Sequence, residues 1–113
     1  MRYFLIIILS WIGVNANATL AACQSLEQRI FAQINPTKQS SCRFNLINAK
    51  NNMTNACNSL AIARTFPAQQ SSAAAYNELD LAVKQNCPRV ISTYRRGLLR
   101  ILRDDVASFQ NTL

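Results

Sequence analysis

The chain of 113 residues contains no histidine and only two glycines, Gly13 and Gly97. Histidine is the most frequent general base in enzymes and the usual activator of serine and cysteine nucleophiles, so its absence removes most hydrolytic arrangements. Two glycines far apart in the sequence also cannot form a glycine-rich loop that cradles phosphates. We therefore predict that the protein is not an enzyme and uses no cofactor.

Acidic side chains are also scarce, with five in the whole chain: Glu27, Glu78, Asp80, Asp104 and Asp105. Residues one or two positions apart on a helix point in different directions, so none of these carboxylates is expected to form a catalytic pair. The four cysteines include no Cys-x-x-Cys pair, and no histidine is present to complete a zinc site. The sequence thus predicts neither catalytic residues nor a metal site.

No apolar run is long enough to span a bilayer, which takes about 20 residues. The longest, residues 4–14, follows the basic residue Arg2 and precedes the sequence Ala16-Asn17-Ala18. A basic start, a short apolar run and a small-x-small site are typical of a signal peptide. We predict that residues 1–18 are removed by cleavage after Ala18 and that the protein is secreted or periplasmic.

A second pattern in the same region gives an alternative. The sequence Leu20-Ala21-Ala22-Cys23 resembles the site at which bacterial lipoprotein precursors are cut and lipidated on cysteine. Lipidation at Cys23 would leave three cysteines for disulfides, whereas cleavage after Ala18 leaves all four. The two interpretations exclude each other.

Four segments have apolar residues at helical spacing, at about residues 20–34, 41–65, 72–86 and 88–110. The breaks between them fall at Asn35-Pro36, Phe66-Pro67 and Cys87-Pro88, because a residue before proline is pushed out of the helical region. The second segment has the narrowest apolar stripe, and its six asparagines, the first of which is Asn45, are expected on its outer side. Short connections predict an all-α, four-helix up-and-down bundle over residues 19–113.

Four cysteines in a short exported chain predict two disulfides. Cys42 and Cys57 are about 22 Å apart on one helix, too far to bond to each other, so each must reach another helix. Folding consecutive helices back on each other brings Cys23 near Cys57 and Cys42 near Cys87. The predicted disulfides are therefore Cys23–Cys57 and Cys42–Cys87.

The last segment combines an apolar half with a stripe of arginines. Val90, Ile91, Tyr94, Leu98, Ile101, Leu102, Val106 and Phe109 are predicted on the apolar half. Arg95 also falls on the apolar half, and the hairpin register places it opposite Asp80; it is expected either to pair with Asp80 or to extend its charged end to solvent at the edge of the bundle. Asp105 falls there without a predicted partner. The arginines on the opposite side fall within about 60° of one another and, with Arg95 beside them, form the candidate site for an anionic partner: Arg89, Arg96, Arg100 and Arg103.

Removal of residues 1–18 would lower the formal charge from +7 to +6, which still favours anionic partners. We expect a small exported helical binding protein, an inhibitor, effector or accessory factor, whose partner is a protein or another anionic macromolecule. The alternative is a membrane-active or envelope-associated protein that uses the cationic amphipathic helix at its C-terminal end. The pattern does not favour a nucleic acid, because no aromatic residues interleave the basic side.

Overall fold

The computed structural model describes residues 19–37, 40–85 and 93–113. Residues 19–34 are helical, and the helices α2 (Ser40–Ala61), α3 (Thr65–Lys84) and α4 (Thr93–Asn111) follow. These described ranges contain no strand. The all-α class predicted from the sequence is confirmed.

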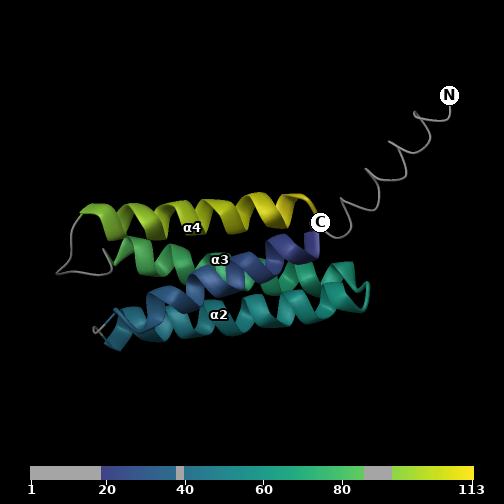
Figure 1. The fold of residues 1–113 in the computed structure, drawn as a ribbon, viewed down its shortest axis with the longest axis horizontal. Coiled ribbons are helices and arrows are strands. Elements are labelled where there is room, and N and C mark those ends of the chain that lie inside the picture. Colours follow the sequence, from purple (N-terminus) through teal and green to yellow (C-terminus); the bar gives the residue numbers. More distant parts are fainter. Residues whose placement is uncertain (1–18, 38–39, 86–92) are drawn as a thin grey trace, which may run out of the picture.

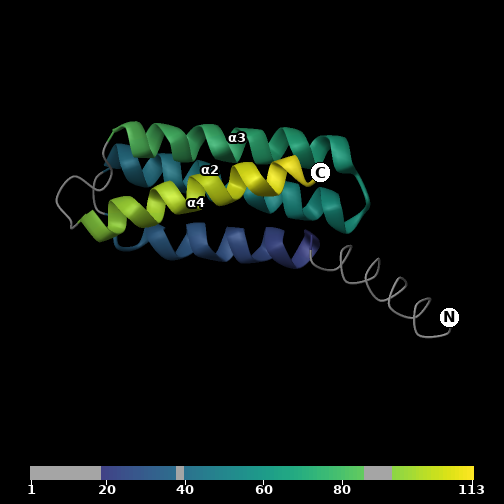
Figure 2. The same ribbon diagram turned by 90° about the horizontal axis from the view of Figure 1, so that it is seen from above.

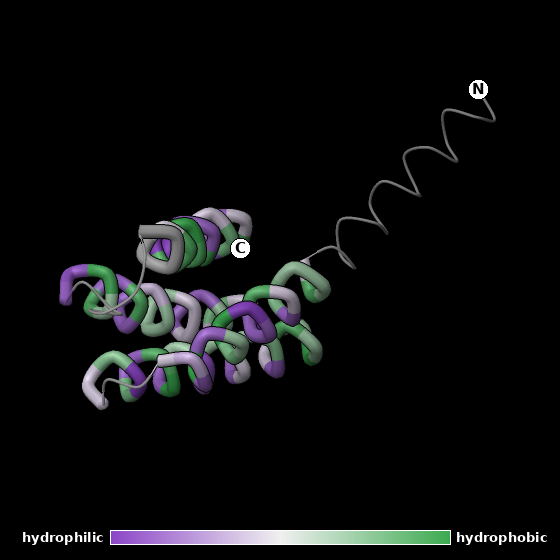
Figure 3. Tube along the Cα trace, turned by 60° about the vertical axis from the view of Figure 1, so that its left-hand side comes forward, coloured by the Kyte–Doolittle hydropathy of each residue, from purple (hydrophilic) through white to green (hydrophobic). Residues whose placement is uncertain are grey.

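Consecutive helical elements run antiparallel and lie side by side (Figures 1 and 2). The N-terminal helical segment, residues 19–34, and α3 both flank α2, while α4 closes the bundle on the other side. Purple and green positions alternate along each helix in Figure 3, as expected for helices with only one side in a core. This is the four-helix up-and-down arrangement expected from short connections.

Helix α2 contributes the longest continuous stripe to the core. From Cys42 to Ala56 the residues of this stripe recur every three or four positions, Cys57 follows directly, and all are at most 5% exposed: Cys42, Leu46, Ala49, Met53, Ala56 and Cys57. They pack with Leu26 and Ile30 of the N-terminal helical segment and with Leu79 of α3. The narrow stripe that the sequence predicts for this segment is therefore its buried side, with Leu60 only partly buried at the end.

A disulfide joins Cys23 to Cys57, whose Cα atoms are 5.6 Å apart. Both residues are in the core, so the bond holds the N-terminal helical segment directly against α2. This confirms the first predicted disulfide and the hairpin register from which it was obtained. The second predicted disulfide includes Cys87, which lies outside the described residues.

The turn between α2 and α3 differs from the predicted one. Helix α2 ends at Ala61 and α3 begins at Thr65, whereas we expected a helix to about 65 and the next from about 72. Ala63 adopts a positive φ of 58°, and the Arg64 amide donates a 2.8 Å hydrogen bond to the Ser59 carbonyl. Pro67 is the third residue of α3, where its missing amide proton costs nothing, because amides in a first turn have no helical acceptor.

Two polar residues inside helices are buried, Ser72 of α3 and Asn45 of α2. Ser72 is fully buried inside α3, and its hydroxyl donates a 2.7 Å hydrogen bond to the Ala68 carbonyl. Asn45, predicted on the outer side of α2, is 7% exposed, and its Nδ2 has no hydrogen-bond partner among the described residues. A helical wheel drawn around the apolar stripe puts Asn45 at its edge, and contact with a neighbouring helix covers that edge.

Replacing both Cys23 and Cys57 by alanine should lower the free energy of unfolding by about 4 kcal/mol. The bond closes a loop between residues 34 positions apart, and the unfolded chain regains the corresponding entropy when the bond is absent. Urea denaturation followed by circular dichroism measures this difference.

Fully reduced wild-type protein is the control, because it keeps every sulfur atom and loses only covalent links, including the one that Cys42 forms. Its loss should equal or exceed that of the double variant. A loss below about 1 kcal/mol in both samples would mean that helix packing alone holds the N-terminal helical segment in place.

Candidate functional site

The buried side of α4 decides which of its charged residues are accessible. Its core positions are Leu99, Leu102, Val106 and Phe109, each at most 5% exposed. Ile101, which the sequence places on the apolar half, is exposed, and Leu99 takes its place in the core. Apolar residues are spread widely around this helix, so the sequence does not decide which of two orientations, differing by about one residue, faces the core. Packing against α3 and the N-terminal helical segment decides between them.

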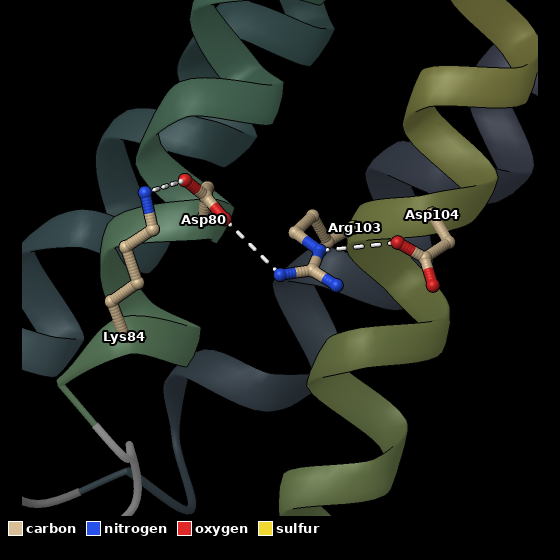
Figure 4. A network of polar contacts seen from close by, with 4 residues as sticks. All are labelled: Asp80, Lys84, Arg103 and Asp104. Atoms are coloured by element: carbon tan, nitrogen blue, oxygen red, sulfur yellow. Dashed lines mark hydrogen bonds and ion pairs between the residues drawn. The ribbon is translucent and has the colours of Figure 1, made fainter.

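The predicted arginine site is described only in part. Arg89 lies outside the described residues, and Arg95 and Arg96 lie in the first turn of α4, with their side chains outside the description. Arg100 is exposed and makes no ion pair with any described residue. Arg103 is different, because its side chain is only 23% exposed and points toward α3 (Figure 4).

Arg103 is the centre of a network of ion pairs between α3 and α4 (Figure 4). Its Nη1 lies 3.1 Å from an Asp80 carboxylate oxygen, and its Nε lies 3.1 Å from Asp104. Lys84, one turn after Asp80 on α3, lies 2.8 Å from the other Asp80 oxygen. The Arg103 guanidinium thus links α4 to α3, and each carboxylate oxygen of Asp80 contacts one positively charged side chain.

Asp80 thus pairs across the helix interface with Arg103. The ion pair predicted between Arg95 and Asp80 stays a prediction, because the side chain of Arg95 lies outside the description. The arginine stripe gave no sign of the pair with Arg103, since Arg103 falls on the side opposite to most apolar residues in a sequence-based wheel. Once Leu99 and Leu102 face the core, Arg103 lies at the edge of the buried side beside α3.

These contacts shift the ionisation of the groups involved. The hydrogen bond from Lys84 is the main cause that lowers the pKa of Asp80 below 3.8, and Arg103 adds to it against the opposing effect of burial. The same hydrogen bond raises the pKa of Lys84 above 10.5. Asp80 is therefore a firmly ionised structural carboxylate, unlike a general acid or base, which needs a pKa near the working pH.

Asp105 has a partner that sequence reasoning missed. Its carboxylate lies 2.8 Å from Arg29 of the N-terminal helical segment, with both side chains nearly half exposed. The pair borders a groove of about 690 Å³ between that segment and α4, with Leu26 and Phe109 among its lining residues. Arg103 and Asp105 thus occupy the two edges of the buried side of α4, each paired with a different neighbouring helix.

Among the described residues, no three side chains of the metal-ligating types come together. None of the helices in these ranges has the length and apolarity needed to cross a membrane. No family model, curated protein or solved structure matches the chain.

Asp80→Asn should destabilise the protein at neutral pH, because it removes the carboxylate that both Arg103 and Lys84 contact. A lowered pKa means that the stabilisation is present above the unfolded-state value of about 3.8 and is lost as the pH falls through the lower folded-state value. The melting temperatures of wild type and variant should therefore differ at pH 7 and converge as the pH falls through the folded-state pKa of Asp80, which lies below 3.8.

The matched control is Asp104→Asn, which removes a more exposed carboxylate from the same arginine. Exposed ion pairs contribute little, so we expect a smaller loss that is further reduced by added salt. Equal losses for the two variants, or a difference for Asp80→Asn that persists at low pH, would contradict the central role given to Asp80.

Proposed function

We propose that the protein is an exported, disulfide-stabilised helical binding protein that contacts an anionic macromolecule through the arginine side of α4. The observation that carries this proposal is the contrast between two neighbouring arginines. Arg103 is held by Asp80 and Asp104, whereas Arg100, one turn away, is exposed without an ion pair among the described residues. A guanidinium in that position is free to form bidentate hydrogen bonds with carboxylates or phosphates.

The surface beside Arg100 is also open. A Cβ atom added at Gly97, three residues before Arg100, would have no neighbour within 4 Å. Residues three apart lie on the same side of a helix, so a partner can approach the α4 backbone closely at this point. Position 96 lies one turn before Arg100 on the same helix, which extends the proposed contact toward the start of α4.

For localisation, we propose export with cleavage after Ala18. The Cys23–Cys57 bond supports cleavage over lipidation at Cys23, because a sulfur atom bonded to another cysteine cannot also carry a thioether-linked lipid. A disulfide inside the core is also typical of proteins that fold in an oxidising compartment.

The membrane-active alternative is weaker on energetic grounds. It requires α4 to withdraw its four core residues, Leu99, Leu102, Val106 and Phe109, from the bundle. Burial of each such side chain contributes roughly 1.5 to 3 kcal/mol, so detachment would cost about as much as the entire stability of a small domain. We therefore propose that α4 binds its partner while docked in the bundle.

We also propose that Cys42 pairs with Cys87, which would fix the end of α3 to the start of α2. In support, Cys42 is fully buried, and no cysteine among the described residues is a free thiol.

Proteolysis without reduction followed by mass spectrometry should yield a peptide pair containing Cys42 and Cys87. Recovery of Cys87 as a free thiol or bonded between two chains would overturn this pairing.

Charge reversal at Arg100 tests the proposed binding site. Arg100→Glu should weaken binding to immobilised poly-glutamate at low salt by about five-fold or more, because it replaces an attraction with a repulsion at the site. Surface plasmon resonance at several salt concentrations measures the change.

Arg64→Glu provides the matched control, since Arg64 is also exposed and the change in net charge is the same. It should weaken binding by less than about two-fold. Equal losses for the two variants would show that binding follows net charge alone and would reject α4 as the binding site.

A further inference from the structure

Several large apolar side chains remain exposed outside the core: Phe31, Phe44, Ile47, Ile62, Phe66, Leu81 and Ile101. Three of them occur together on the N-terminal helical segment and α2. Phe31 is 53% exposed, Phe44 is 63% exposed and Ile47 is 37% exposed. We call these three residues the Phe44 ridge.

The geometry of α2 brings the ridge together. Phe44 and Ile47 are three residues apart and lie on the same side of the helix, and Lys50 follows after another three. The Lys50 Nζ lies 5.9 Å from the centre of the Phe31 ring on the neighbouring segment. Lys50 therefore links Phe31 to Ile47 and Phe44 of α2, although the connection between the helices separates Phe31 from them in the sequence.

The charges that flank Phe44 and Ile47 on α2 are positive, whereas Glu27 lies one turn before Phe31 on the N-terminal helical segment. Arg43 is exposed immediately before Phe44, and Lys50 borders the ridge at its other end. No aspartate or glutamate occurs between Glu27 and Glu78, so α2 has no acidic residue at all. On α2, cations flank exposed apolar side chains and no carboxylate on that helix compensates them, which complements a surface that is negatively charged outside and apolar beneath.

The shape of the ridge favours a lipid surface over a protein partner. Phe44 and Ile47 project from the outer side of α2 and Phe31 from the neighbouring N-terminal helical segment, and none of the three lines either of the two grooves located elsewhere on the described bundle. Protein hot spots usually sit in well-packed pockets, whereas projecting aromatic and aliphatic side chains with neighbouring cations suit the boundary between headgroups and acyl chains.

We propose that the Phe44 ridge binds an anionic lipid surface. Phe31, Phe44 and Ile47 enter the headgroup region, and Arg43 and Lys50 contact lipid phosphates. The bundle stays closed in this mode, because none of its core residues is needed for the contact. The ridge lies on α2 and the arginine side on α4, which occupy opposite sides of the bundle in Figure 1, so this inference is independent of the function proposed above.

Co-sedimentation of the full chain with vesicles tests the proposal, with phosphatidylcholine alone compared with an equal mixture of phosphatidylcholine and phosphatidylglycerol. Wild-type protein should bind the anionic vesicles and not the neutral ones. Phe44→Ser should reduce binding about ten-fold, the effect of losing one inserted aromatic side chain. Phe66→Ser is the matched control, since Phe66 is 68% exposed in the turn region at the start of α3 and should leave binding unchanged.

A fluorescent reporter tests insertion directly. Trp11 is the single tryptophan of the sequence, so in a Trp11→Phe background a Phe44→Trp variant carries the sole reporter whether or not residues 1–18 are removed. Its emission should shift to shorter wavelength on anionic vesicles, while Phe66→Trp should show no shift.

Three outcomes would overturn the proposal. The first is an absence of binding to anionic vesicles, and the second is an equal loss for Phe44→Ser and Phe66→Ser. In the third, Phe44→Ser weakens binding to poly-glutamate as strongly as to vesicles, which would assign the ridge to an acidic protein. Arg100→Glu should leave vesicle binding within about two-fold of wild type, so failure of one proposal leaves the other standing.

Discussion

The bond between Cys23 and Cys57 fixes the position of the N-terminal helical segment on α2, and the other contacts of that segment depend on it. The core needs such a bond because many of its buried residues are small: Ala49, Ala56, Ala68, Ala75 and Ala82. Alanine lets helices approach closely but removes little apolar area from water. The same register places Arg29 beside Asp105 of α4 and the Phe31 ring beside Lys50 of α2.

The parts of the fold that sequence reasoning predicted are those with a narrow geometric constraint. In α2, apolar residues alternate at intervals of three and four, which leaves one buried side. The limit on Cα separation in a disulfide then excludes bonding between Cys42 and Cys57, and the hairpin register selects Cys23 for Cys57. Where a pattern allows one solution, the structure agrees with it.

The errors occurred where the sequence permits two solutions of similar energy. Phe66-Pro67 can end a helix or stand in the first turn of the next, and the left-handed residue of the turn is Ala63, a type that gives no signal for that conformation. In α4 the wide apolar arc did not distinguish Leu99 from Ile101 as a core residue. The two choices differ by a small rotation of α4 about its axis. With Leu99 in the core, Arg103 pairs with Asp80 across the helix interface, whereas the other orientation would leave Arg103 exposed.

The pairing of Arg103 also changes how the formal charge of +7 is distributed. In α4, Arg103 is neutralised by Asp80 and Asp104, so the described part of the arginine side offers less free charge than its sequence suggests. In α2, Arg43 and Lys50 have no acidic residue on their own helix to offset them, and they flank exposed apolar side chains. Charge neutralised within the chain contributes little to attraction of a partner, because its field falls off as that of a dipole. The free positive charge of the described bundle is therefore divided among Arg100 on α4, Arg64 in the turn before α3, and the surroundings of the Phe44 ridge.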